Sequence, residues 1–297
     1  MTQVIWDGLF VGSFYALIAL GYSMVYGIIK LLNFAHGDIY MLGAFIGFAL
    51  LTSLHGIPAS LSLVALLIVL VLSMLLTGTV GVIIERIAYR PLRGAPRLAA
   101  LITAVGVSFS LEYGISATAG PNPRAYPVRV DGRVFDVIGA RVSLPQIILM
   151  LISALLMIGL NTYIQKTSTG RAMRSIALDM HGSLLMGINV NAVITRTFFI
   201  GSALAGAAGV MSGAYYGKID FLMGFIIGLK AFTAAVIGGI GNIKGAMLGG
   251  LVLGLAEAFG AQWFGGQWRD VFAFAVLILF LTLRPTGILG ERVTERV

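Results

Sequence analysis

The chain has 297 residues, of which 58% are hydrophobic and 11% charged, and its formal net charge is +8. Its mean hydropathy of +0.97 excludes an ordinary soluble domain and places the chain in a bilayer. The basic residues are spread over segments that flank apolar stretches, which favours anionic lipid rather than nucleic acid as their partner. The chain has no cysteine, which excludes disulfides, thiolate catalysis and cysteine-based metal sites.

The sequence predicts a succession of apolar helices. Each apolar segment has about 17–25 residues, enough for a helix to cross about 30 Å of hydrocarbon. We expect an all-α polytopic membrane protein with about eight to nine transmembrane helices, some short or re-entrant, in a single transmembrane domain over residues 1–297. No basic region precedes the first segment, so it is expected to stay as a span and not to be a cleaved signal peptide. The expected spans are 5–27, 36–54, 60–84, 98–118, 144–164, 193–216, 222–240, 245–262 and 270–284.

A polar segment enters the second span with the sequence Asn33-Phe34-Ala35-His36-Gly37-Asp38. Asn33, His36 and Asp38 either line a solute path or belong to a turn that satisfies free backbone groups at a helix end.

Most basic residues of the connectors lie on the inner side if the N-terminus is outside and the C-terminus inside, although the arginines of the loop at 119–143 spoil an otherwise clean split. The loop at 119–143 is then external and is expected to form a strand-turn-strand at Asp131-Gly132. The internal basic residues would be Lys30, Arg86, Arg90, Arg93, Arg97, Lys166, Arg171, Arg174, Arg196, Lys244, Arg284, Arg292 and Arg296, and the external ones Arg124, Arg129, Arg133, Arg141, Lys218 and Arg269.

A long polar and cationic segment, 165–191, interrupts the apolar sequence between two spans. Its apolar residues recur at helical spacing, with charged and polar residues around the rest of the wheel. This pattern predicts an amphipathic helix on the inner surface, resting on lipid headgroups or docked on a soluble partner. The apolar residues are Met173, Ile176, Ala177, Met180 and Leu184, and the polar ones Arg171, Arg174, Ser175 and Asp179.

Small residues at a spacing of four predict close helix packing. The clearest series is Gly201, Ala205, Gly209, Gly213 and Gly217; a second is Gly241, Gly245 and Gly249, and shorter ones are Gly8/Gly12 and Gly43/Gly47.

Charges within the spans are the next candidates for function. Glu112, Lys230 and Glu257 lie in apolar segments, where each charge costs at least about 2.5–3.5 kcal/mol. They either pair or hydrogen-bond between helices, with snorkelling as another option for Lys230, or line a substrate path. Lys230 lies in the Gly-rich segment 222–240, the weakest span, which has the composition of a broken or re-entrant helix. Two carboxylates and one lysine are few for a proton-driven carrier.

Catalytic and nucleotide-binding motifs are missing from the sequence. His36, His55 and His181 lie far apart and give no spaced set of metal ligands. Neither GxxxxGK[ST] nor GxGxxG is present, so the chain is not expected to bind a nucleotide, a metal or another cofactor.

The chain resembles the permease subunits of bacterial branched-chain amino-acid ABC transporters in three separated segments. These are LGYSMVYGIIKLLNFAHGDIYMLGAF (20–45), TGRAMRSIALDMHGSLLMGINV (169–190) and GLKAFTAAVIGGIGNIKGAMLGG (228–250). Lys30 departs from the family by adding a positive charge where a neutral residue is expected. The resemblance implies that 165–191 is the cytoplasmic coupling loop and that the loop at 119–143 is periplasmic. It also implies that the coupling loop contacts the ATPase through Gly170, Arg171, Ala172, Arg174, Asp179, Gly187, Ile188 and Asn189.

The resemblance further implies an importer in the bacterial inner membrane, built from this chain, a second permease subunit, two cytoplasmic ATPases and a periplasmic binding protein. The chain itself would be no enzyme. Its expected function is to form the path for branched-chain or related hydrophobic amino acids, with Asn33, His36, Asp38, Lys230 and Glu257 as candidate path residues. The alternatives are the same architecture carrying urea, a short amide or a sugar, and, more remotely, a self-sufficient channel or secondary carrier whose interrupted helices would lie at 33–47 and 228–245.

Overall fold

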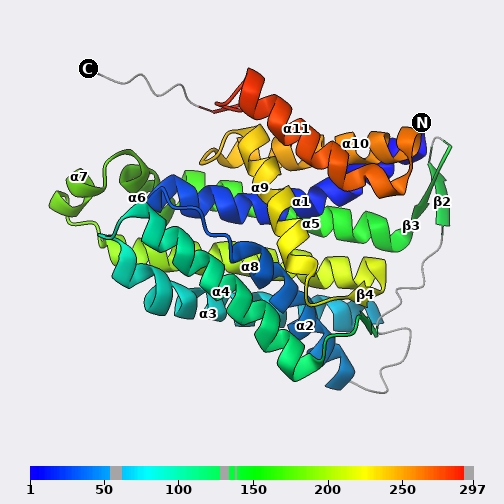
Figure 1. Ribbon diagram of the computed structural model, residues 1–297, viewed down its shortest axis with the longest axis horizontal. Coiled ribbons are helices and arrows are strands. Elements are labelled where there is room, and N and C mark those ends of the chain that lie inside the picture. The colour runs from blue at the N-terminus through cyan, green and yellow to red at the C-terminus, as the bar shows by residue number, and fades with distance from the viewer. Residues whose placement is uncertain (54–61, 128–133, 138, 291–297) are drawn as a thin grey trace.

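The computed structural model describes residues 1–53, 62–127, 134–137 and 139–290. Most of the apolar helices run side by side in a layered bundle, the short helix α9 crosses them, and two small strand pairs lie at one end of the bundle (Figure 1). The apolar helices are α1 (Thr2–Ile29), α2 (His36–Ser53), α3 (Ser62–Ile84), α4 (Arg97–Ala119), α5 (Leu144–Lys166), α8 (Val190–Tyr216), α9 (Met223–Gly238), α10 (Ile243–Phe264) and α11 (Arg269–Leu283).

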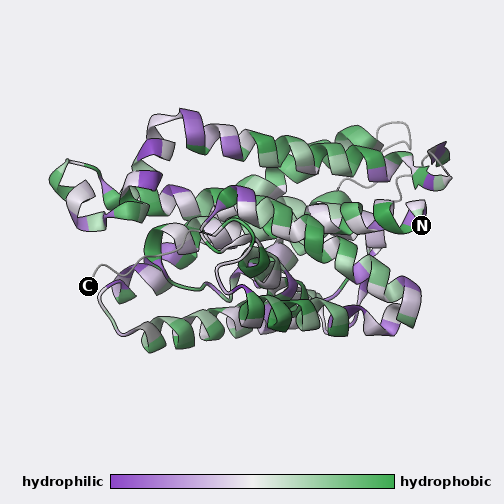
Figure 2. Cartoon of the chain, turned by 90° about the horizontal axis from the view of Figure 1, so that it is seen from above, coloured by the Kyte–Doolittle hydropathy of each residue, from purple (hydrophilic) through white to green (hydrophobic). Residues whose placement is uncertain are grey.

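Each of the nine predicted spans coincides with one of these helices. Seven helical stretches within the described residues are long and apolar enough to cross a membrane. The other two helices fall short because α2 begins with polar residues and α9 has only 16 residues, about 24 Å of helix. Hydrophobic residues dominate the middle of the long helices, and hydrophilic residues gather mostly towards the two ends (Figure 2). This distribution is that of an all-α polytopic membrane protein.

Two helices form the centre of the bundle. In α1 and α8, 72% and 78% of the most apolar stretch is buried, whereas in α4 and α11 the buried share is 22% and 6%. Helix α1 packs most extensively on α10, and α8 packs on both α2 and α3. The peripheral helices therefore offer their apolar residues to lipid or to other subunits.

Glycines allow these close approaches. A side chain at Gly209 would clash with the carbonyl oxygen of Tyr40 in α2, and a Cβ at Gly12 would come within 2.9 Å of Leu251 Cα in α10. Two glycines of the predicted series have another role. Gly217 and Gly241 lie outside the helices with φ of 67° and 93°, so they allow the chain to turn at the end of a helix or between helices and do not pack one helix on another.

The end of the bundle that carries the N-terminus also carries the four strands of the described residues. Strand β1 (Arg124–Ala125) pairs with β4 (Lys218–Ile219), and β2 (Val134–Val137) forms a hairpin with β3 (Ala140–Ser143). The backbone N–H of Arg141 in β3 donates to Gln3 Oε1 at 2.8 Å, which ties the hairpin to α1. The predicted turn at Asp131-Gly132 lies outside the described residues.

The opposite end carries α6 (Ser168–Leu178) and α7 (Met180–Leu185), which project beyond the long helices (Figure 1). The prediction of one amphipathic helix here is wrong in part. Asp179 has φ −150° and ψ 108°, so the helix breaks at this residue and the apolar face does not continue. Met173 and Ile176 are buried within the chain itself, where α6 packs on α5, α1 and α8, whereas the sequence predicted that this apolar face lies on lipid or on a partner. Leu184 lies beyond the break and is 52% exposed.

Candidate functional site

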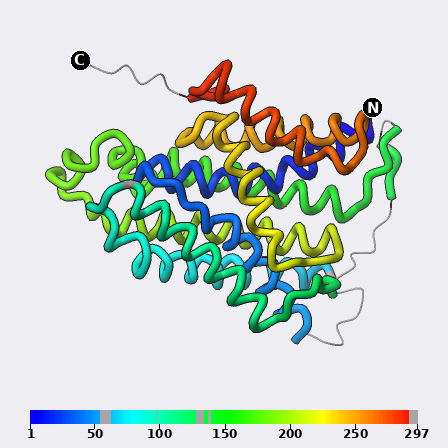
Figure 3. Tube along the Cα trace, in the orientation of Figure 1, coloured from blue at the N-terminus to red at the C-terminus, as the bar shows by residue number. Residues whose placement is uncertain are grey.

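Helix α2 begins inside the bundle and not at its end. Residues 30–35 leave the end of α1 and turn back along the bundle before α2 starts (Figure 3). The imidazole of His36 lies beside Gly21, which precedes the last residue of α1, Ile29, by eight residues or about 12 Å. The first turn of α2 is therefore placed at membrane depth. A helix end at this depth leaves free backbone groups away from water, which is tolerated only where the backbone is buried in protein or lines a cavity.

Polar side chains meet at this first turn. Asn33 Oδ1 accepts a hydrogen bond from Tyr89 Oη at 2.6 Å, and Asp38 Oδ2 accepts one from Ser108 Oγ in α4. Glu112 lies one turn further along α4 than Ser108 and is buried. We call Asn33, His36, Asp38, Ser108 and Glu112 the α2 polar cluster; all five are at most 6% exposed, so the cluster is closed to solvent in this structure.

Several polar atoms of the α2 polar cluster have no hydrogen-bond partner among the described residues. They are Asn33 Nδ2, His36 Nε2, Asp38 Oδ1 and Glu112 Oε1, which make up four of the six such buried side-chain atoms; the others belong to Ser23 and Tyr126. Each unsatisfied buried group costs about 1–3 kcal/mol. A concentration of such atoms at one place indicates a site that is completed by something else, such as water or a polar solute.

The second group of charges lies around Lys230 in α9. Lys230 Nζ is 3.1 Å from Glu257 Oε1 in α10 and 2.6 Å from Asp270 Oδ1 at the start of α11. Tyr15 Oη in α1 donates to Glu257 Oε2 at 2.8 Å. We call Tyr15, Lys230, Glu257 and Asp270 the lysine cluster. The side chain of Lys230 is 5% exposed, so of the alternatives that the sequence left open the structure shows pairing with Glu257 and not snorkelling.

The two clusters do not form one continuous site. Gly224 and Gly228 of α9 pack on the first turn of α2, where a Cβ at Gly228 would come within 2.9 Å of Gly37 Cα. Lys230 follows Gly228 by two residues, about 200° around the helix. The α2 polar cluster and the lysine cluster therefore lie on different faces of α9. The described α9 is a single short helix, whereas the sequence left open a broken one.

The structure gives local reasons for several residues of the predicted coupling set. A Cβ at Gly170 would clash with Ile164 of α5, and Arg174 donates to the carbonyl oxygen of the same residue. Gly187 has φ 79°, and Asn189 caps α8 by accepting a hydrogen bond from Ala192 N at 3.0 Å. Ala172 is half-buried on α6. These residues fix the position of α6 and α7 relative to the long helices.

Other residues of the α6–α7 region face outwards. Arg171 and Asp179 are exposed. The tip also presents large apolar side chains: Leu178, Leu185 and Met186 are 87%, 89% and 83% exposed. Ser175 and Ser183 lie within hydrogen-bond distance at 3.0 Å and connect α6 to α7. An apolar tip with charges beside it, held rigidly on the bundle, has the composition of a protein-docking surface.

Sequence reasoning missed some members of both clusters. Tyr15 and Ser108 lie in apolar helices, where a hydroxyl gives no pattern signal, and only the fold brings them to a carboxyl group. Tyr89, which donates to Asn33, lies in a π-helical turn, Glu85–Tyr89, and was missed as well. Asp270 stands at the edge of the last span and looks like an ordinary boundary residue. Its contact with Lys230 depends on how α11 packs on α9.

Comparison with known proteins agrees with this picture. The family described as branched-chain amino acid transport system, permease component, matches residues 4–281. The high-affinity branched-chain amino acid transport system permease protein BraD of Pseudomonas aeruginosa is 48% identical over 299 residues, covering 99% of this chain and 97% of BraD. The LivH permease proteins of Salmonella typhimurium and Escherichia coli are each 43% identical over 301 residues, covering 99% of this chain and 97% of theirs. No solved structure matches the chain.

Proposed function

Because the chain belongs to the family of branched-chain amino acid transport system permease components, we propose that it forms the path for such amino acids in an ATP-driven importer. The single observation that carries the proposal within the molecule is the α2 polar cluster, a closed group of unpartnered polar atoms at membrane depth. The names of the relatives favour an amino acid over urea, an amide or a sugar. The neighbouring lysine cluster belongs to the proposal as a second polar contact along the path.

The chemistry of the α2 polar cluster suits a zwitterion. Two neighbouring carboxyl groups in a buried site attract a cation, and the free oxygens Asp38 Oδ1 and Glu112 Oε1 are available to an ammonium group. Asn33 Nδ2 is a free donor for a carboxylate oxygen. The aromatic rings of Tyr22 and Phe232 lie close by, with Tyr22 4.9 Å from the His36 ring, and supply an apolar lining for a hydrocarbon side chain.

Uptake of radiolabelled leucine, urea and ribose by cells that carry all subunits tests this proposal. We expect uptake of leucine and not of urea or ribose. Asp38→Asn should reduce leucine uptake at least about tenfold, because the loss of one charge–ammonium hydrogen bond costs about 1.5–3 kcal/mol. Ser110→Ala, which changes an exposed hydroxyl of α4, is the control. Uptake of ribose or urea in place of leucine would refute the substrate assignment.

We propose further that the importer contains a second permease subunit, two ATPases that hydrolyse ATP, and a periplasmic binding protein, so that this chain is itself no enzyme. The α6–α7 tip supports the ATPase contact, because its exposed apolar residues and its charges Arg171 and Asp179 are held by a rigid junction with α5 and α8. Movement of the partner would reach α5 through Gly170 and α8 through Asn189.

Changes at the tip should uncouple the ATPase without unfolding the membrane domain. We expect Leu185→Asp and Arg171→Glu each to lower the amount of co-purified ATPase at least about tenfold, the size of effect that central interface residues show. Asp179→Lys should act in the same direction. The free energy of unfolding in detergent should change by less than about 0.5 kcal/mol, because these side chains are exposed. Arg141→Glu at the opposite end is the control, and equal ATPase recovery from all variants would remove the docking role from the tip.

For localisation, the family and the seven apolar helices indicate a multi-pass membrane protein. We propose that it lies in the bacterial inner membrane with the N-terminus outside and the C-terminus in the cytoplasm. The distribution of basic residues supports this orientation, since most of those in the connectors fall at the α6–α7 end.

Cysteine labelling tests the orientation on a clean background, because the chain has no natural cysteine. With an impermeant thiol reagent, Arg141→Cys in β3 should be labelled in intact cells, and His181→Cys in α7 should be labelled only after lysis. Both side chains are exposed in the structure. The reverse pattern would invert the orientation and would move the proposed ATPase contact away from α6 and α7.

A further inference from the structure

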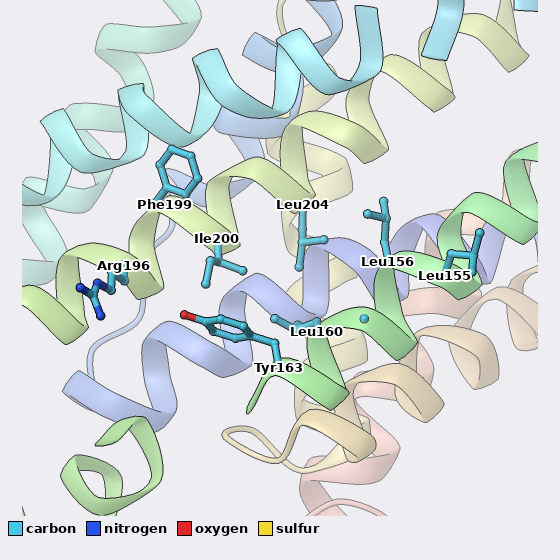
Figure 4. Close-up of a pocket in the computed structure, with 9 residues that line it drawn as sticks. Leu155, Leu156, Leu160, Tyr163, Arg196, Phe199, Ile200 and Leu204 are labelled. Carbon is cyan, nitrogen blue, oxygen red and sulfur yellow. The ribbon is translucent and has the colours of Figure 1, made fainter. Parts of the chain in front are cut away.

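A cavity of about 490 Å³ lies between α5 and α8 on the outer surface of the bundle. Figure 4 shows that its lining comes from these two helices, with Leu156, Leu160 and Tyr163 on α5 and Phe199, Ile200 and Leu204 on α8. Residues 196–204 of α8 cover about 12 Å along the helix axis, close to the depth of one leaflet of a bilayer about 30 Å thick. The cavity therefore has the length and the apolar lining that suit one acyl chain.

The apolar cavity ends at a basic pocket. Arg196, at one end of the row of side chains in Figure 4, also lines a second cavity of about 380 Å³ at the α6–α7 end of the bundle, together with Arg86 and Arg90. No carboxylate lies within ion-pair distance of these three arginines in the part of the chain that the structure describes. Asn189, Asn191 and Thr195 supply further polar groups beside them.

We propose that the two cavities together form a binding site for one anionic phospholipid. The phosphate lies among Arg86, Arg90 and Arg196, and an acyl chain occupies the apolar cavity between α5 and α8. An arginine shared by both cavities is the feature that a lipid requires, because headgroup and chain are covalently joined. Basic pockets between transmembrane helices are a recognised form of anionic lipid site. The inference requires only that the chain spans a membrane and is independent of the substrate.

The apolar half of the site can be tested at Gly159. A Cβ at this residue, which lines the cavity, would meet no atom within 4 Å, so the side chain of Gly159→Leu can begin there without a clash and is expected to occupy the cavity. Gly114→Leu in α4 is the matched control, because a Cβ there also meets no atom within 4 Å and the residue lies outside the cavity. Native mass spectrometry of the full-length chain should show one bound phosphatidylglycerol, lost in Gly159→Leu and kept in Gly114→Leu.

The basic half of the site can be tested with Arg86→Gln, Arg90→Gln and Arg196→Gln. Each should weaken phosphatidylglycerol binding about fivefold, since one basic residue near an anionic lipid contributes about that factor. Lys244→Gln, an exposed lysine outside both cavities, is the charge-matched control. Phosphatidylcholine and inorganic phosphate should bind at least about fivefold more weakly than phosphatidylglycerol.

Several results would overturn the proposal. Equal binding of phosphatidylcholine would show that the arginines do not select the ligand. Equal binding of inorganic phosphate would reduce the site to a simple anion pocket. Loss of a co-purifying membrane subunit in Gly159→Leu, with phosphatidylglycerol still bound, would show that the cavity is an interface between permease subunits.

Discussion

Lys230→Met should lower the thermal stability of the protein in detergent by about 3–5 kcal/mol, because it leaves buried carboxylates without their cation. Lys230 Nζ contacts Glu257 Oε1 at 3.1 Å and Asp270 Oδ1 at 2.6 Å, and the side chains of Lys230 and Glu257 are only 5% and 7% exposed. Asp270 is 53% exposed and can be solvated, so most of the cost arises at Glu257. Thermal unfolding monitored by tryptophan fluorescence measures the effect.

The double variant Lys230→Met/Glu257→Gln should recover most of this loss. It removes both buried charges, and the glutamine can still accept the hydrogen bond that Tyr15 Oη donates to Glu257. Lys244→Met, an exposed lysine at the end of the bundle, should be neutral. Equal instability of the single and double variants would mean that the two charges are not coupled.

Transport by the stable double variant then separates two roles of the lysine cluster. Normal leucine uptake would show that the cluster only holds α9, α10 and α11 together. Loss of uptake at recovered stability would show that the charges themselves contact the solute or respond to it. The proposed role of the lysine cluster in the path requires the second outcome, whereas the first outcome would restrict the path to the α2 polar cluster, which has free donors and acceptors.

The spans could be predicted from the sequence because each depends on a local property, a run of apolar residues long enough to cross a membrane. The same reasoning found Lys230 and Glu257, since any charge in such a run stands out. It also placed Met173 and Ile176 on one apolar face of a helix, where helical periodicity holds, but it did not predict that this face packs on the chain's own helices.

Other features depend on contacts that no local pattern encodes. The break at Asp179 changes the backbone conformation and not the pattern of apolar and polar residues. The helical periodicity of the sequence therefore continues through Asp179, although the helix ends there. Likewise, the polar residues Asn33 to Asp38 could be identified as unusual, but their depth follows from the return of residues 30–35 beside α1. Ser108, which donates to Asp38, and Glu112 come from α4, about 70 residues further along the chain, so only tertiary packing assembles the α2 polar cluster.

Gly209→Ala should lower the free energy of unfolding by at least about 1–3 kcal/mol. The replacement of glycine by alanine within a helix normally raises it by about 1 kcal/mol. The reversal follows from the packing of α8 on α2: the new Cβ would clash with the carbonyl oxygen of Tyr40 and would lie 2.8 Å from the backbone nitrogen of Ala44. Backbone atoms cannot rotate away as a side chain can, so α2 must shift. Thermal unfolding in detergent measures the change, and Gly209→Leu should have a larger effect.

Gly114→Ala in α4 is the matched control, because a Cβ there meets no atom within 4 Å and the helix propensity gain should remain. A control on α8 itself is unsuitable because 78% of its most apolar stretch is buried.

The contact at Gly209 also matters for transport, because Tyr40 lies only two residues after Asp38 on α2 and its hydroxyl donates to Ser212 Oγ of α8 at 2.6 Å. Gly209→Ala should therefore reduce leucine uptake in cells even at temperatures where the protein stays folded. Equal stability of the Gly209 and Gly114 variants would show that α2 yields at this contact, and the first turn of α2 would then not be held rigidly by α8.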